Sequence, residues 1–275
     1  MASVIFGLAS ALSWGAGDFS GGLATKRAPV YGVVIVSQII GVLLLVGLAL
    51  ALSERIPPPV QLMWGGVAGL GGGLGLVALY SALASGRMGV AAPVSAVVAA
   101  VIPVGFGLLT EGWPTAPRLS GFGLALAAVW FISRPDEAGL RARDLGLPLI
   151  AGLGFGLFFV ALDHANDEGV LWPVVAARLA SASLLTVMAR LTRQPYLPGR
   201  EYLGLIALSG VLDTGGNAFY ALAARLGRLD VAAVLGSLYP ASTVWLAWLI
   251  LKERLTRLQW VGVIAALAAI VLITL

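Results

Sequence analysis

The sequence predicts an all-α integral membrane protein with ten transmembrane helices, arranged as two five-helix inverted repeats around a central cavity. Its composition is the first reason: 59% of the 275 residues are hydrophobic, 11% are charged, and the mean hydropathy is +0.97. A soluble domain carries about 25% charged residues, so this chain cannot cover its outside with polar groups in water. The other two reasons are the regular apolar runs and a similarity between the halves of the chain.

Apolar runs separated by charged residues, proline and glycine define the spans, each needing roughly 20 apolar residues. The predicted spans are 2–24, 30–53, 60–85, 88–110, 117–133, 145–164, 169–191, 202–225, 230–251 and 257–275. The one substantial polar connector falls almost at the middle of the chain. We therefore divide one membrane domain into a first repeat (1–134), a connector (135–144) and a second repeat (145–275).

The two halves resemble each other at a spacing of about 140 residues, which shifts by one at a small gap. Segment 80–92 (YSALASGRMGVAA) resembles segment 220–233 (YALAARLGRLDVAA), and Glu111 precedes a Gly- and Ala-rich span much as Glu253 does. One spacing kept through successive spans argues against chance alignment of Ala- and Leu-rich helices. Because five spans is an odd number, the second repeat must be inserted upside down. Inverted repeats are a transporter architecture with the binding site near the midplane between repeats.

Cofactor and metal chemistry finds little support in the composition. Cysteine is absent and His164 is the single histidine, so cysteine metal sites and histidine-rich sites are excluded. His164 lies with Asp163, Asp167 and Glu168 between the sixth and seventh predicted spans; a solvated loop is the simpler interpretation, and a metal site there is the alternative. We expect no cofactor and no metal. The high pI, about 9.8, arises from loop residues, which indicates membrane orientation and anionic lipid rather than nucleic acid.

The distribution of basic residues predicts an orientation. Loops after even-numbered spans hold Arg55, Arg118, Arg225 and Arg228, whereas loops after odd-numbered spans hold twelve lysines and arginines. The positive-inside rule therefore predicts that the odd loops face the cytoplasm and that both termini lie outside. This inference depends on a count of ten spans.

The end of the chain carries the most specific motif. Residues 238–256 (LYPASTVWLAWLILKERLT) and 259–262 (QWVG) place a proline in a span, then an apolar run ending in Lys-Glu-Arg, then a Gly-containing last helix; Trp14-Gly15 lies in the first span. In these features the chain resembles the drug/metabolite transporter superfamily, in its ten-span EamA-type branch. The resemblance implies a two-repeat bundle that moves metabolites, amino acids or drugs, often outward. Two points depart from it: Glu111 lacks a following arginine, and family members commonly have cytoplasmic termini.

Ionisable groups inside spans are candidate site residues, because each costs about 2.5–3.5 kcal/mol at a helix centre on insertion scales. Asp213 lies near the centre of the eighth span and Arg178 near the middle of the seventh. Asn217 and Tyr220 follow Asp213 at helical spacing and share its face. Two interpretations stay open: a structural Asp213–Arg178 ion pair, or binding of substrate or a proton by Asp213.

Asp18 lies beyond the centre of the first span, one turn after Trp14 on the same face. An aromatic ring beside an acid suits a cationic or amphipathic ligand, and a desolvated carboxylate can carry a proton near neutral pH. The alternative is that Asp18 reaches the membrane interface or pairs with Lys26 or Arg27.

Polar residues of lower cost complete the candidate cavity. Tyr80 and Tyr220 occupy matching positions of the repeats, which favours a symmetric pair facing one cavity; the alternative for each is an interfacial position. Prolines inside spans can kink or break helices. The full candidate set is Trp14, Asp18, Gln38, Tyr80, Ser95, Arg178, Asp213, Asn217, Tyr220 and Tyr239.

We expect a multi-pass protein of the cell membrane that is not an enzyme. It would be a secondary transporter, and an exporter, of a small metabolite, amino acid or drug-like solute by alternating access, coupled to protons or to exchange. Its partners would be the small-molecule substrate, the lipid bilayer and protons, without nucleic acid, and it would be a monomer or homodimer. The alternative is an intramembrane enzyme acting on a lipid-linked substrate, for which only the 163–168 cluster offers acids and a histidine near an interface.

Overall fold

The computed structural model describes residues 1–84, 88–132, 145–251 and 256–274, and within these it is helical without strands. The predicted connector 135–144 and Glu253 lie outside the described residues. The helices are α1 (Ala2–Thr25), α2 (Val30–Ala51), α3 (Pro59–Ala84), α4 (Met88–Thr110), α5 (Ala116–Ile132), α6 (Gly146–Ala165), α7 (Leu171–Leu191), α8 (Leu203–Arg225), α9 (Leu229–Gly236), α10 (Tyr239–Leu251) and α11 (Arg257–Thr274), with a short 3-10 turn, η2 (Arg200–Tyr202), before α8.

The predicted span 230–251 is not one helix, because it breaks between α9 and α10. Pro240 has no backbone N–H and so cannot complete the helical hydrogen bond to the carbonyl of Gly236. The chain tightens at the break, where the Leu238 N–H donates to the Leu235 carbonyl at 3.1 Å. Pro103, by contrast, leaves α4 continuous. Of Pro93, Pro103 and Pro240, the first two lie in the continuous helix α4, and Pro240 alone lies at a break.

Five segments are long and apolar enough to cross a membrane: α2, α3, α6, α7 and the Leu229–Ile250 stretch that joins α9 to α10. Shorter apolar helices cover Val94–Thr110, Ala116–Phe131 and Arg257–Ile273. Helices α1 and α8 carry Asp18 and Asp213 in their interiors and fall outside both sets. Several apolar helices of this length make the chain a multi-pass membrane protein.

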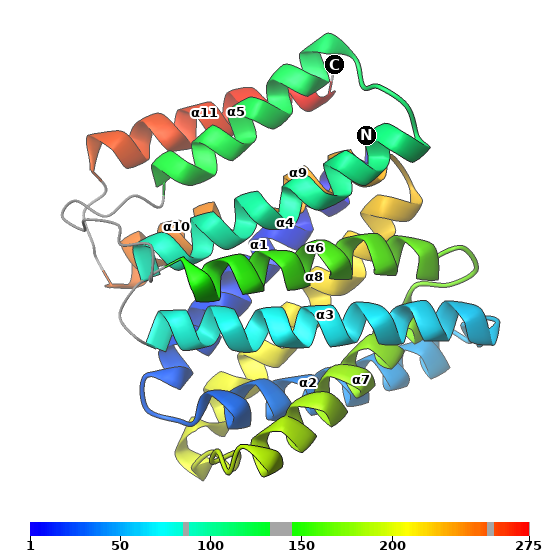
Figure 1. The fold of residues 1–275 in the computed structure, drawn as a ribbon, viewed down its shortest axis with the longest axis vertical. Helices are drawn as coiled ribbons and strands as arrows, with labels where there is room; N and C mark the ends of the chain where they lie inside the picture. Colours follow the sequence, from blue (N-terminus) through cyan, green and yellow to red (C-terminus); the bar gives the residue numbers. More distant parts are fainter. Residues whose placement is uncertain (85–87, 133–144, 252–255, 275) are drawn as a thin grey trace.

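The two halves of the chain interleave rather than forming separate bodies (Figure 1). Each of α1 to α5 packs most extensively on a helix of the second half: α1 on α8, α2 on α7, α3 and α4 on α6, and α5 on α11. Helix α3 also packs along α7, so it lies between two helices of the other half. The core of the molecule is therefore the contact between its halves.

Glycine rows on α3 make this close packing possible. A Cβ added at Gly65 or Gly69 would overlap backbone atoms of α7, and one at Gly73 would overlap Ser181 of that helix. On another side of α3, a Cβ at Gly75 would press on α6. Small residues let helix backbones approach in membranes. The run 69–75 is therefore a packing surface.

The connection after α2 holds the start of α7. The Glu54 carboxylate accepts hydrogen bonds from the backbone N–H groups of Leu171 at 2.8 Å and Trp172 at 3.2 Å, and the Trp172 indole N–H donates to the Glu54 carbonyl at 3.0 Å. A carboxylate at a helix N-terminus satisfies free N–H groups and complements the helix dipole. Conversely, the backbone of Tyr196, in the connection after α7, lies against Gly32 at the start of α2. Each half thus holds an element of the other.

Candidate functional site

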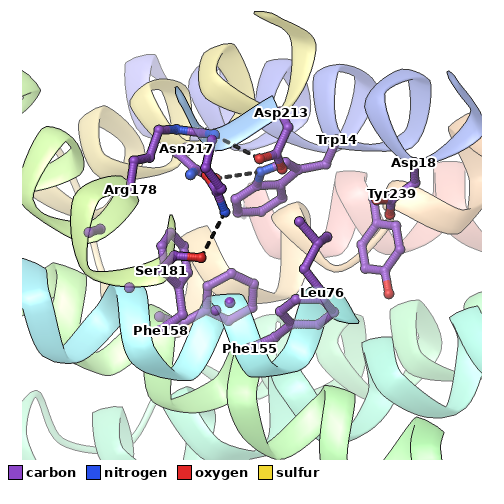
Figure 2. Close-up of a pocket in the computed structure, with 16 residues that line it drawn as sticks. Trp14, Asp18, Leu76, Phe155, Phe158, Arg178, Ser181, Asp213, Asn217 and Tyr239 are labelled. Carbon is purple, nitrogen blue, oxygen red and sulfur yellow. Dashed lines mark hydrogen bonds and ion pairs between the residues drawn. The ribbon is translucent and has the colours of Figure 1, made fainter. Parts of the chain in front are cut away.

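A cavity lies between helices of both halves. Figure 2 shows its charged and amide side chains on one side and phenylalanine rings on the other. Its lining residues are Trp14, Asp18, Gln38, Gly69, Gly72, Gly73, Leu76, Phe155, Phe158, Phe159, Ala177, Arg178, Ser181, Asp213, Asn217 and Tyr239. A largely apolar lining with a few convergent polar groups is typical of small-molecule sites.

A chain of polar contacts crosses one wall of the cavity from α2 through α7 to α8. The Arg178 guanidinium donates to the Asp213 carboxylate at 2.7 Å and to the Gln38 side-chain oxygen at 2.5 Å. The Gln38 amide donates onward to the Ser181 hydroxyl at 3.0 Å. The Arg178 side chain is 1% exposed and that of Asp213 is 13% exposed. The predicted ion pair therefore exists, and both members line the cavity.

The position of the guanidinium depends on a glycine of α2. A Cβ at Gly41 would overlap Thr214 and the Cδ and Nε atoms of Arg178. The Nε atom of Arg178 is buried there and makes no hydrogen bond within the described residues. Gly41 thus leaves the space that lets Arg178 lie fully buried against α2.

An aromatic wall adjoins this polar chain. The Trp14 indole N–H donates to the Asn217 side-chain oxygen at 2.7 Å, which fixes the ring between α1 and α8. The ring centroid of Trp14 lies 5.6 Å from that of Phe159 and 6.3 Å from that of Phe158. Tyr220 does not line the cavity; it is fully buried, and its ring stacks on that of Phe159 with 4.6 Å between the ring centroids. Such rings supply apolar contact and a negative π face toward the cavity.

Asp18 also lines the cavity, but unlike Asp213 it has no arginine beside it in the described ranges. Within the part of the chain that the structure describes, no lysine or arginine makes an ion pair with it, and Lys26 and Arg27 are exposed. Its titratable neighbours are Asp213, Tyr239 and Tyr80, and the Tyr80 hydroxyl makes a hydrogen bond with its carboxyl group. Asp18 is therefore a half-buried carboxylate that has no basic partner among the described side chains.

Seven of the ten predicted site residues line the cavity, and Tyr80, Ser95 and Tyr220 do not. Tyr80 lies 3.5 Å, oxygen to oxygen, from the hydroxyl of Ser209 on α8. Ser95 lies behind Tyr239, 2.9 Å between the two hydroxyl oxygens, and Tyr220 donates to the Phe159 carbonyl at 3.2 Å. The matching tyrosines thus pack on opposite helices, Tyr80 against Gly21 of α1 and Tyr220 on α6, instead of facing one cavity.

Sequence reasoning missed the three phenylalanines of α6 and Ser181. The residues Phe155, Phe158 and Phe159 fall in a uniformly apolar span, where no pattern distinguishes a cavity face from a lipid face. Ser181 follows Arg178 by three residues, a spacing that places both on one helix face. That spacing was a usable signal for Ser181.

A second polar cluster ties the end of α4 to the start of α9. Arg228 donates to the Gly112 carbonyl at 2.8 Å and to the fully buried carboxylate of Asp230 at 2.7 Å, and this hydrogen bond raises the pKa of the Arg228 guanidinium. The Glu111 carboxylate accepts the backbone N–H of Leu229 at 3.0 Å and caps α9. These contacts lie outside the cavity lining.

His164 has a packing environment. Its ring lies 5.0 Å from that of Trp64 and 5.3 Å from that of Phe106, and its Nδ1 lies 2.9 Å from the Val160 carbonyl. Within the described ranges, no group of three histidines, cysteines or acids could hold a metal ion. The described residues around His164 therefore form packing contacts and no metal-ligand cluster.

Comparison with known proteins agrees with the two-half organisation. The model of the EamA-like transporter family matches residues 1–134 and, separately, 145–275. An uncharacterized protein of Methanocaldococcus jannaschii is 27% identical over 131 residues, 48% of this chain and 94% of its own length. The spermidine export protein MdtI of an Enterobacter species is 31% identical over 105 residues, 36% of this chain and 92% of its own. One crystal structure, 19% identical, shares the fold with a TM-score of 0.77 over 98% of this chain and 95% of the other.

Proposed function

Because this chain belongs to the EamA-like transporter family, we propose that it is a secondary transporter that exports a small metabolite, amino acid or drug-like solute by alternating access. The family makes it a membrane transporter. The direction, the mechanism and the class of solute are our proposal.

The observation that carries this proposal is a cavity walled by both repeats. Helices α1, α2 and α3 of the first half and α6, α7, α8 and α10 of the second all contribute lining residues. A site between inverted repeats changes its access when one repeat rocks against the other. With α9 and α10 counted as one interrupted segment, the α-helices of the described residues number ten. That number is compatible with the two inverted sets of five spans that we propose. Discontinuous helices beside the site are a further feature of such carriers.

Export is the direction we propose, in keeping with the MdtI relative, whose name gives export as its activity. The energy source would be a proton or solute gradient, with Asp18 as the group that exchanges its proton or ligand. Its carboxylate faces the cavity without a basic partner among the described residues, so it is free to change occupant.

The test is flux in proteoliposomes that contain purified protein, with a panel of labelled metabolites, amines and amino acids. Asp18→Asn and Asp213→Asn should each change the flux of any solute that the unmodified protein moves. Asp167→Asn is the matched control, because Asp167 is an exposed acid outside the cavity. If no solute of a broad panel moves, or if both cavity substitutions leave flux equal to that of the control, the proposal fails.

A further inference from the structure

We infer that the cavity takes a small organic cation with a single positive charge and an apolar body, and that Asp18 is its counter-ion. This inference rests on the proposed function and narrows it, since it selects amines over amino acids and anions. It follows from the charges, the donors and the rings that line the cavity.

The charge of the lining comes first. Asp18, Arg178 and Asp213 are the acidic and basic residues of the lining. Arg178 and Asp213 compensate each other at 2.7 Å, so the remaining charge is that of one carboxylate. A charge in a desolvated site needs a partner. With Asp18 ionised, a ligand of charge +1 leaves the occupied cavity neutral, whereas an anion beside that carboxylate leaves two uncompensated negative charges.

The donors of Arg178 exclude a ligand carboxylate as the alternative partner. Its Nη1 donates to Gln38, its Nη2 donates to Asp213, and its Nε is enclosed beside Gly41. A carboxylate is usually held by two parallel N–H groups of the guanidinium fork. With 1% of the side chain exposed, no such pair of donors is presented to the cavity. A zwitterionic amino acid would therefore bring a carboxylate that has no cationic partner.

The rings of the lining determine the body of the ligand. Trp14, Phe155, Phe158 and Phe159 share the cavity with Asp18, and Figure 2 shows several of these rings on the side away from Arg178. Aromatic faces attract an ammonium group and pack against hydrocarbon. The single free carboxylate also argues against di- and polyamines, because a second ammonium group would have to displace Arg178 from Asp213.

Binding to the detergent-purified protein tests the inference without requiring transport. The probes are phenethylamine and related monoamines, phenylalanine as zwitterion, 3-phenylpropionate as anion, 2-phenylethanol as neutral analogue, and putrescine and spermidine as multivalent amines. Titration calorimetry should show that monoamines bind most tightly. Asp18→Asn should weaken their binding by roughly tenfold or more, the loss expected for removal of a buried counter-charge. Asp18→Glu should retain most of the affinity, and Asp167→Asn should retain all of it.

The ion pair supplies a second, independent arm. Arg178→Gln with Asp213→Asn removes both charges together and leaves Asp18 as the counter-ion, so preference for monoamines over phenylalanine should persist in this double variant. The inference is overturned if phenylalanine, 3-phenylpropionate or spermidine binds more tightly than every monoamine, or if Asp18→Asn leaves monoamine affinity unchanged. Monoamine binding that depends on Asp18, without flux in proteoliposomes, would refute transport and uphold the cation site. Flux of neutral or anionic solutes that ignores Asp18 would do the reverse.

Discussion

Replacement of Gly69 by alanine should loosen the contact between α3 and α7. The added Cβ would fall on the carbonyl of Ala177, far inside contact distance, and that carbonyl belongs to a helix backbone that cannot rotate away. The clash is relieved only if α3 and α7 separate, and overpacking of this kind costs about 1–3 kcal/mol. Gly66 on the same helix is the matched control, because a Cβ there meets nothing within 4 Å.

The two variants share the gain in helix propensity, roughly 1 kcal/mol for glycine to alanine, so it cancels between them. Gly69→Ala should therefore be less stable than Gly66→Ala by about 1–3 kcal/mol, the clash alone. Denaturant unfolding in detergent micelles, followed by tryptophan fluorescence, measures this difference. Because Gly69 lines the cavity, flux should also fall in that variant. Equal unfolding midpoints for the two variants would show that α3 and α7 are not packed as closely as described.

Three further outcomes are expected. Arg178→Gln should lower the unfolding free energy by about 3–5 kcal/mol, because it leaves a buried carboxylate without a partner. Adding Asp213→Asn should recover most of this loss, as measured by thermal unfolding. If the effects of the two substitutions simply add, the pairing is contradicted. Arg228→Gln should likewise destabilise the protein by stranding the buried Asp230. Because the pKa of Arg228 is raised, the arginine side of this contact contributes below the ordinary arginine pKa and is lost only as pH rises through the higher folded value. The difference from the unmodified protein should therefore be constant from neutral to moderately alkaline pH, and a difference that vanishes within that range would refute it. Reporters fused to the two termini should lie on the same side of the membrane if the chain has ten spans: the charge bias predicts the outside, the family resemblance the cytoplasm, and opposite sides would exclude an even number of spans.

The fold was largely predictable because its signals are local. Apolar runs give nearly the same boundaries as the helices, as in 88–110 against Met88–Thr110. The similarity between segments 80–92 and 220–233 predicted two repeats, and the separate family matches to 1–134 and 145–275 confirm a two-repeat architecture. The break at residues 237–238 was predictable only as a possibility, since Pro103 has the same chemistry and leaves its helix intact. Whether a proline breaks a helix depends on neighbours that satisfy the freed carbonyl, and those are tertiary.

The site residues that could be predicted are those whose charge lies inside a predicted span, because such a side chain must face a cavity or a partner. Asp213 and Arg178 carry opposite charges near the centres of their predicted spans, so the free-energy cost of an unpaired charge in the membrane was enough to predict their pairing. Tyr80 and Tyr220 show the limit: each can lie in a cavity, at an interface or between helices with similar energy, and the structure buries both between helices. The sequence indicates that a polar side chain needs a partner, and only the packing of several helices decides which partner it receives.

The interleaving of the two halves has a consequence for how such a chain could have arisen. Because each of α1 to α5 has its largest contact in the other half, one half alone would expose most of the surface that it normally buries. A half-length chain could recover contacts of this kind by associating with a second copy. The two relatives matched over 131 and 105 residues, 94% and 92% of their lengths, are chains of about that size. In this view, fusion of two such copies converts an association that depends on concentration into one that is guaranteed by the covalent chain, and it frees the halves to diverge until only one carries Asp213 and Arg178.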